Sequence, residues 1–270
     1  MSTFHRPLAI LAFATLLIAP AARAETTSEF IELTALADEL AFDIRQNRDL
    51  MLELCSASEW CRVYGQELIA AIEDSGTTLR LGALAVPMVE EMLELMDPEP
   101  KVALFEFYRS DLGRKIVDIE IDSRTDAFLE RVELEGAEYY ASIADEEERY
   151  MLAESIDSES DRSATARLIH GTAQRVVDFV AQRARDRGET AQPVKLELKS
   201  RDRHAYHLRL AFTLKDLTTE EGEAFIEFLE SDAGQQWSQT KREVRVRAAR
   251  EASKPIINRL VNELGSAPSN

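Results

Sequence analysis

A nine-residue motif, called the repeated phrase below, occurs twice in this chain. It constrains the fold more than any other feature of the sequence. The first copy reads Phe105-Glu106-Phe107-Tyr108-Arg109-Ser110-Asp111-Leu112-Gly113, and the second reads Ile226-Glu227-Phe228-Leu229-Glu230-Ser231-Asp232-Ala233-Gly234. An aromatic residue, a serine, an aspartate and a glycine keep the same spacing in both copies. A chain that repeats such a phrase is expected to repeat the local structure that the phrase encodes.

Each copy has the pattern of a helix, a sharp corner and a second helix. Asp97-Pro98 precedes the first copy and Thr218-Thr219-Glu220-Glu221 precedes the second. Both are typical helix starts, because an aspartate or threonine side chain caps the first turn. A serine followed by an acid suits the start of the next helix, and the glycine allows a close backbone approach. The corner motif comprises Phe107, Tyr108, Ser110, Gly113, Phe228, Ser231 and Gly234.

Two roles are open for these corners. A helix N-terminus favours anions, so each corner could bind one. The alternative is a packing corner that sets the angle between two helices. Asp111 and Asp232 would repel an anion at this place, which favours the packing role.

The same residues carry a resemblance to a known family. Phe107-Tyr108-Arg109-Ser110-Asp111-Leu112-Gly113-Arg114 resembles the F-Y-x-S-P-x-G corner of a family of secreted bacterial helical proteins, catalogued as a domain of unknown function. The stretch from Thr218 to Trp237 is similar to it too. Asp111 and Asp232 stand where the family usually has proline, and Leu229 stands in place of the tyrosine. The resemblance implies a helical, exported protein and implies no catalytic residues.

The N-terminus has the pattern of a secretory signal peptide. His5 and Arg6 precede an apolar run from Leu8 to Ile18, and Ala22-Arg23-Ala24 is a typical cleavage site. We expect residues 1–24 to be removed and the rest to be exported, to the periplasm or outside the cell. The apolar run is short for a membrane span, and an uncleaved anchor is the alternative. No stable membrane insertion is expected after cleavage.

The charge balance is strongly acidic. The chain has 50 acidic and 32 basic residues, a formal net charge of −18, which disfavours binding to nucleic acid. A hydrophobic content of 45% indicates a globular core. Residues 241–260 invert this balance, with seven basic and two acidic side chains. They either neutralise acidic neighbours within the fold or recruit an anionic partner.

The two cysteines, Cys55 and Cys61, are expected to form one disulfide. An even pair in an exported protein usually means a structural bridge. The alternative is a pair of reactive thiols, although a redox site would favour the C-x-x-C spacing, which is absent. Positions six apart on a continuous helix point to different faces, so the bridge needs a break between the cysteines.

Apolar residues recur at helical spacing along most of the chain. We therefore predict an all-α fold, a helical bundle built from two related halves in tandem. Residues 25–155 form the first half, 163–270 the second, and the acidic stretch 156–162 is the predicted linker. One long helix is expected from residue 111 to about residue 154. Apolar and polar residues alternate over residues 193–198, and the sequence does not decide whether this stretch is a strand or part of a helix.

The sequence contains no hydrolase, metalloprotease or nucleotide-binding motif. His204 and His207 lie one helical turn apart and could hold a metal with a third ligand from elsewhere. Surface histidines are the preferred interpretation, because no carboxylate lies at the matching turn. We expect no metal and no cofactor.

These observations favour an exported soluble binding or interaction module, whose partner is an unknown protein or small molecule. One alternative is an envelope hydrolase or metal-dependent enzyme with its site between the two halves. The other is a structural homo-oligomer. Without a catalytic motif, the balance is against an enzyme.

Overall fold

The computed structural model describes residues 26–57, 69–74, 81–143, 147–186, 188 and 203–265. All regular secondary structure in these ranges is helical, which confirms the predicted all-α fold. The predicted signal peptide, Cys61 and residues 193–198 lie outside the described residues. Cys55 lies in a helix, but its side chain is outside the described part as well.

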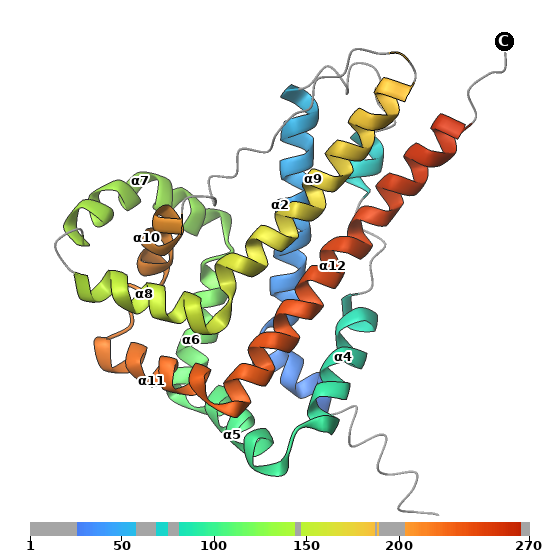
Figure 1. Cartoon of the computed structure of the whole chain (residues 1–270). Coiled ribbons are helices and arrows are strands. Elements are labelled where there is room, and N and C mark those ends of the chain that lie inside the picture. The colour runs from blue at the N-terminus through green and yellow to red at the C-terminus, as the bar shows by residue number, and fades with distance from the viewer. Residues whose placement is uncertain are drawn as a thin grey trace, which may run out of the picture.

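Three long helices form the body of the molecule. They are α2 (Leu36–Ala57), α9 (Arg162–Asp186) and α12 (Asp232–Gly265), and they run side by side in the same direction (Figure 1). Asp43 pairs with Arg245 near the start of α2, while Met51 and Ile256 share a hydrophobic cluster with the middle of α9 further along. The shared surface of the three helices is therefore polar near its start and apolar near its end.

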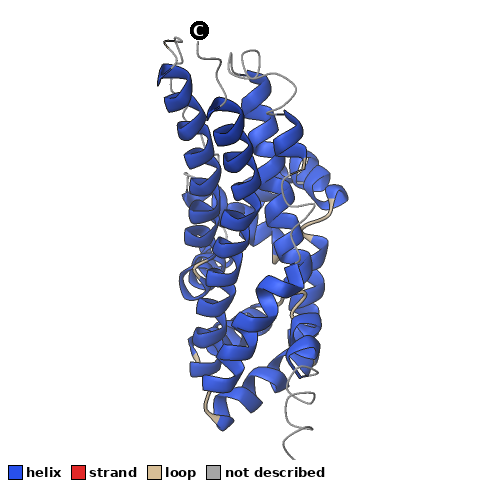
Figure 2. Ribbon diagram, turned by 90° about the vertical axis from the view of Figure 1, so that its right-hand side faces the viewer, coloured by secondary structure: helices blue, strands red, loops and turns tan. Residues whose placement is uncertain are grey.

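Seven shorter helices surround this body, and Figure 2 shows the all-helical packing from the side. α4 packs on α2 and α12, α10 packs on α7 and α8, and α11 packs on α8 and α12. Two further short helices cover residues 26–33 and 69–73. The bounds of the seven are α4 (Leu81–Leu95), α5 (Pro98–Arg109), α6 (Asp111–Asp122), α7 (Asp126–Ile143), α8 (Glu147–Ser160), α10 (Arg203–Thr213) and α11 (Thr219–Glu230).

The two copies of the repeated phrase form the α5–α6 and α11–α12 corners, and both corners use the same capping bonds. Ser110 Oγ accepts from the Gly113 N–H at 3.0 Å and donates to the Phe107 carbonyl at 2.6 Å. Ser231 Oγ accepts from the Gly234 N–H at 3.1 Å and donates to the carbonyl three residues before it, also at 2.6 Å. One hydroxyl thus links the end of one helix to the start of the next.

The glycine of each corner lies against the backbone of the preceding helix. A Cβ atom on Gly113 would lie 2.0 Å from the Phe107 carbonyl oxygen, and one on Gly234 would lie 2.1 Å from the Phe228 carbonyl oxygen. Real Cβ atoms do not approach backbone this closely, so each corner requires glycine. Alanine does not fit at these two positions because its methyl group would overlap the backbone, and not because of the backbone dihedral angles.

The two corners also contact each other. The rings of Phe107 and Phe228 occupy equivalent positions in the two copies, and they stack with their centroids 3.6 Å apart and their planes within 2°. Tyr108 meets Phe228 edge-on, and Phe30 packs on both Tyr108 and Trp237. This aromatic cluster lies within the main hydrophobic core.

We expect Ser110→Ala to destabilise the fold by about 1 kcal/mol, because it removes the cap of α6. Ser110→Gly should cost only a few tenths of a kcal/mol, since a glycine cap exposes the backbone to water. Urea denaturation followed by circular dichroism measures both changes. Ser142→Ala, an exposed position in α7, is the control and should change stability less. Equal effects for the capping serine and the control would contradict the capping role.

The helix expected from residue 111 to about residue 154 is wrong, because the chain forms α6, α7 and α8 instead. Thr125 explains the first break: its Oγ1 accepts from the Phe128 N–H at 3.2 Å and caps α7. A threonine that competes for backbone donors in this way favours a new helix start over helix continuation. The break leaves Arg124 in the turn between α6 and α7.

The stretch 156–162, predicted as the linker between the two halves, is helical in the structure except at one residue. Residues up to Ser160 belong to α8, and α9 begins at Arg162. The break is Asp161 alone, with a φ of +52°, a conformation that aspartate tolerates better than most residues. Ile156 is fully buried in the main core, so this segment is part of the packed fold.

Candidate functional site

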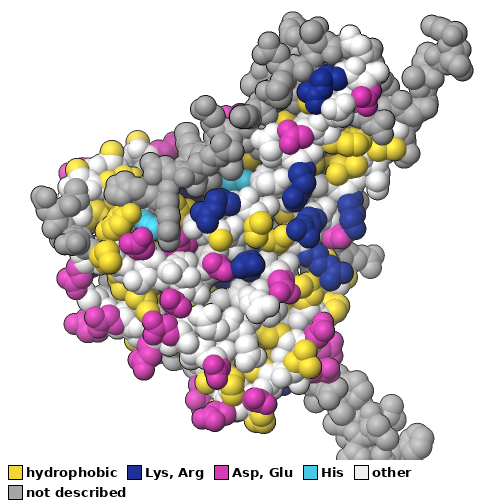
Figure 3. Space-filling model, viewed as in Figure 1, with side chains coloured by type: hydrophobic (Ala, Val, Ile, Leu, Met, Phe, Trp, Pro, Cys, Tyr) yellow, Lys and Arg dark blue, Asp and Glu magenta, His cyan; other side chains and the backbone are white. Residues whose placement is uncertain are grey.

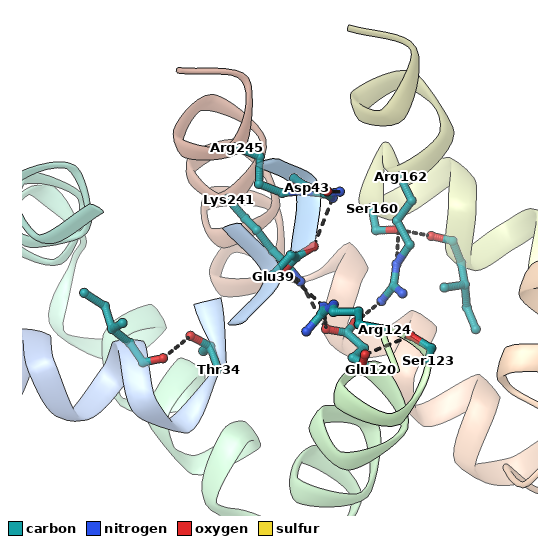
Figure 4. Close-up of polar contacts among 12 residues, drawn as sticks. Thr34, Glu39, Asp43, Glu120, Ser123, Arg124, Ser160, Arg162, Lys241 and Arg245 are labelled. Carbon is teal, nitrogen blue, oxygen red and sulfur yellow. Dashed lines mark hydrogen bonds and ion pairs between the residues drawn. The ribbon is translucent and has the colours of Figure 1, made fainter. Parts of the chain in front are cut away.

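Seven charged side chains meet in the interior between α2, α6, α9 and α12. This buried charge cluster consists of Glu39, Asp43, Glu120, Arg124, Arg162, Lys241 and Arg245, drawn in Figure 4. α2 supplies two acids, α6 and the turn after it supply an acid and an arginine, and α9 and α12 supply the other cations. Burying so many charges is costly unless they pair with one another.

Glu39 is the centre of the cluster. Its side chain is 6% exposed and contacts three cations. Oε1 lies 3.0 Å from Arg245 Nη1, and Oε2 lies 2.8 Å from Lys241 Nζ and 3.3 Å from Arg124 Nη2. Oε2 has no hydrogen bond of good geometry with the described residues, so its negative charge is stabilised by the nearby charges of Lys241 and Arg124.

The other two carboxylates are paired as closely. Asp43 accepts two hydrogen bonds from Arg245, from Nε at 2.7 Å and from Nη2 at 3.0 Å. Glu120 accepts from Arg162 Nη2 at 2.5 Å through Oε1, and from Arg124 Nη2 and Lys241 Nζ through Oε2, both at 3.2 Å. Such charge-assisted bonds are stronger than neutral ones.

These contacts keep the acids ionised. Burial alone would raise the pKa of Glu120, but the charges of Lys241, Arg162 and Arg124 outweigh it and lower the pKa to about 2. The pKa of Glu39 is lowered in the same way, by Arg245, Lys241 and Arg124 against the effect of burial. Both carboxylates are therefore charged at neutral pH and are weak bases.

A pocket of about 250 Å³ opens beside the cluster, between α2, α6, α9, α10 and α12. Six of the seven cluster residues line it, all except Lys241. The rest of its lining includes Phe42, His170, Tyr206 and Arg209. Asn47 also lines it and is 5% exposed, and neither its Oδ1 nor its Nδ2 has a hydrogen-bond partner among the described residues. A buried amide without partners is costly, so this one is unusual.

Two titratable groups at the pocket wall are neutral at neutral pH. The pKa of His170 is lowered, because burial outweighs the opposing charge of Asp43. The pKa of Tyr206 is raised to about 12, chiefly by burial, although Arg162 opposes the shift. The Tyr206 hydroxyl is therefore protonated and can donate a hydrogen bond.

A second buried polar set holds α10 in place next to the pocket. The His207 ring is fully buried, and its Nε2 lies 3.0 Å from Asp157 Oδ2. Its Nδ1 lies 3.3 Å from the Tyr150 hydroxyl. Asp157 Oδ1 also accepts from the Ser163 N–H at 2.6 Å, which links α8 to the start of α9. This set positions Tyr206 on α10 relative to α9.

The preferred interpretation of His207 as a surface histidine is therefore wrong. Its carboxylate partner, Asp157, comes from α8, so no search along its own helix could have found it. His204 lies in the first turn of α10, and its side chain is outside the described part. Among the described residues, no group of three or more His, Cys, Asp or Glu side chains is placed to hold a metal ion.

The residues of the corner motif lie outside the pocket. None of the seven motif residues lines the pocket; they pack in and around the aromatic cluster instead. The sequence reasoning missed the buried charge cluster altogether. A signal was present: Glu39 and Asp43 fall on the same helix stripe as Leu36 and Leu40, at positions that face the core.

The basic stretch 241–260 serves mainly to neutralise acids within the fold. Lys241 and Arg245 pair with the buried carboxylates, Arg242 pairs with Asp161 and Lys254 pairs with Glu251. Figure 3 shows that Lys and Arg side chains gather over α9 and α12, whereas Asp and Glu side chains gather over α8 and α11. The face that carries the positive charge therefore belongs to helices that build the pocket.

Acid should destabilise the fold through Glu120. In the unfolded chain this carboxyl titrates near 4.5, and in the folded protein it titrates near 2. Its contribution is complete above pH 4.5 and is lost as the pH falls towards 2, an effect on the order of 3 kcal/mol. Urea denaturation at pH 7, 5 and 3.5 should show this loss in the wild type and a shallower one in Glu120→Gln. Exposed Glu130→Gln is the control, and an equally shallow slope there would contradict the assignment.

Comparison with known proteins finds no relative for this arrangement. No protein-family model matches the chain, and neither a curated protein nor a solved structure matches it. The resemblance of the corners to a family of secreted helical proteins therefore stays a prediction. None of the described helices is long and apolar enough to cross a membrane.

Proposed function

We propose that this chain is an exported binding protein whose site for a small polar molecule is the pocket between α2, α6, α9, α10 and α12. The single observation that supports it most is Asn47, a buried amide on the pocket wall for which the described part of the chain supplies no partner on either atom. A binding site keeps such a group because a ligand satisfies it.

The dimensions and chemistry of the pocket fit binding better than acid–base catalysis. Its 250 Å³ lies just below the range of about 300–1,000 Å³ typical of drug-sized ligands, so a smaller molecule fits. The carboxylates of Glu39 and Glu120 are held by cations and have lowered pKa values, which makes them poor general bases. The export of the protein rests on the pattern of residues 1–24.

The test is a thermal-shift screen of the purified chain against a library of small polar metabolites. A ligand present at a hundred times its dissociation constant should stabilise the fold by about 2.7 kcal/mol. Ala166→Phe, which fills the pocket from α9, should abolish the shift. Ala127→Phe, at an exposed position of α7, should leave it intact. Binding that survives Ala166→Phe would place the site elsewhere and refute the proposal.

A further inference from the structure

We infer that the ligand of this pocket carries an oxyanion, a carboxylate or a phosphate group, and that Arg209, Arg124 and Asn47 bind it. This inference rests on the proposed function, because it names the chemical class of molecule that the same pocket takes. It follows from which polar atoms of the pocket are already bonded and which are not.

The carboxylate oxygens of the buried charge cluster all lie next to cations, although Glu39 Oε2 makes no hydrogen bond of good geometry with the described residues. The six carboxylate oxygens of Glu39, Asp43 and Glu120 each lie within 3.3 Å of a guanidinium or ammonium nitrogen. A cationic ligand would have to displace an arginine or lysine from one of them. The pocket therefore offers a cation little, although three acids line it.

Donors, in contrast, are left over. Arg124 Nη1 is buried and finds no hydrogen-bond partner among the residues that the structure describes, while Nη2 of the same guanidinium contacts Glu39 and Glu120. The same residues supply no partner for the Asn47 amide. Arg209 is exposed at the pocket wall, and no carboxylate of the described residues pairs with it. Asn47 Oδ1 is a spare acceptor as well, but the amide can present Nδ2 to a ligand, and the two guanidinium groups can only donate. This excess of donors suits a ligand group that only accepts, which an oxyanion does.

The charge of the site points the same way. The cluster has four cations and three carboxylates, and Arg209 adds a further cation. The chain as a whole has a net charge of −18. A local positive excess in so acidic a protein attracts small anions to this place, while the acidic remainder repels long polyanions. A small organic acid or phosphate ester meets both requirements.

Isothermal titration calorimetry of the purified full chain tests this with inorganic phosphate, citrate, glucose and spermidine, at matched ionic strength. We expect saturable binding of phosphate or citrate. Arg209→Gln should weaken it about tenfold, the loss of one charge-assisted hydrogen bond. Asn47→Leu should weaken it as well, without loss of stability, because it removes an unpartnered buried amide. Arg250→Gln, an exposed arginine on α12, is the control and should change little.

The outcomes separate the two proposals. Phosphate binding alone assigns the phosphate group, and citrate binding alone assigns the carboxylate; either supports the inference. Glucose or spermidine binding that Ala166→Phe abolishes, with no binding of phosphate or citrate, would refute the oxyanion but keep the pocket as a binding site. Anion binding that Arg250→Gln weakens as much as Arg209→Gln would reduce the effect to general surface charge and refute the inference. If no probe binds and the metabolite screen is also negative, both proposals fail.

Discussion

Replacing Gly234 by alanine should destabilise the protein by about 3 kcal/mol. The new methyl group would lie 2.1 Å from the Phe228 carbonyl oxygen, and relief of this overlap requires the α11–α12 corner to open. Opening would also lengthen the capping bonds of Ser231 and disturb the stacked ring of Phe228. Urea denaturation followed by circular dichroism measures the loss, and Gly113→Ala at the other corner should behave alike.

Two other glycines provide the controls for this result. A Cβ atom on Gly171, within α9, would meet nothing within 4 Å, so Gly171→Ala should stabilise the protein by about 0.5–1 kcal/mol. The three atoms nearest to a Cβ atom on Gly222 all belong to the side chain of Leu152, which can move. Its cost should lie between those of Gly171→Ala and Gly234→Ala. A neutral Gly234→Ala would show that the corner tolerates a wider angle than the structure has.

Replacing Arg245 by methionine should destabilise the protein by about 3–5 kcal/mol, because it leaves buried carboxylates without their partner. Arg245 donates two hydrogen bonds to Asp43 and pairs with Glu39. Methionine keeps much of the volume but none of the charge. Chemical denaturation at pH 7 measures the change.

The same helix offers a matched control and a rescue. Arg250→Met changes an exposed arginine, for which no ion pair exists among the described residues, and should shift stability by no more than about 0.5 kcal/mol. Asp43→Leu combined with Arg245→Met removes a buried pair as a unit and should recover part of the loss. A double variant as unstable as the sum of its parts would mean that the two residues act independently.

The corners were predictable because their chemistry is local. Ser231 and the Gly234 donor that it caps are three residues apart, and Thr218 and Glu221 form their capping box over the same distance. The boundaries within residues 111–160 were less accessible. Nothing in the sequence distinguishes Thr125 from a residue inside a helix, and only the structure shows that its hydroxyl accepts from the N–H of Phe128. Asp161 separates α8 from α9 through its positive φ angle, which no pattern of apolar residues encodes.

The pocket could not be predicted, because its residues meet only after folding. Asp43 and Arg245 are 202 positions apart, and the sequence of neither helix indicates which residue its charged side chain pairs with. The sequence does contain an unusual pattern. Acids occupy the core stripe of α2, and the cations Lys241 and Arg245 of α12 lie next to the buried residues Val244 and Val246. A charged residue at a core position predicts a partner of opposite charge elsewhere in the chain. Only the packing of α2, α6, α9 and α12 shows which residue that partner is.

The stacking of Phe107 on Phe228 has a consequence for the charges that the two copies bring into the interior. These rings occupy equivalent positions in the two copies of the phrase, so the corners meet through the same residue of each copy. Glu120 and Lys241 are equivalent too, 121 positions apart, and they pair with each other. In a homodimer of identical corners each glutamate would face another glutamate, and the two would repel. Because both copies of the phrase lie in one chain, these two positions carry opposite charges, and the contact between them is attractive.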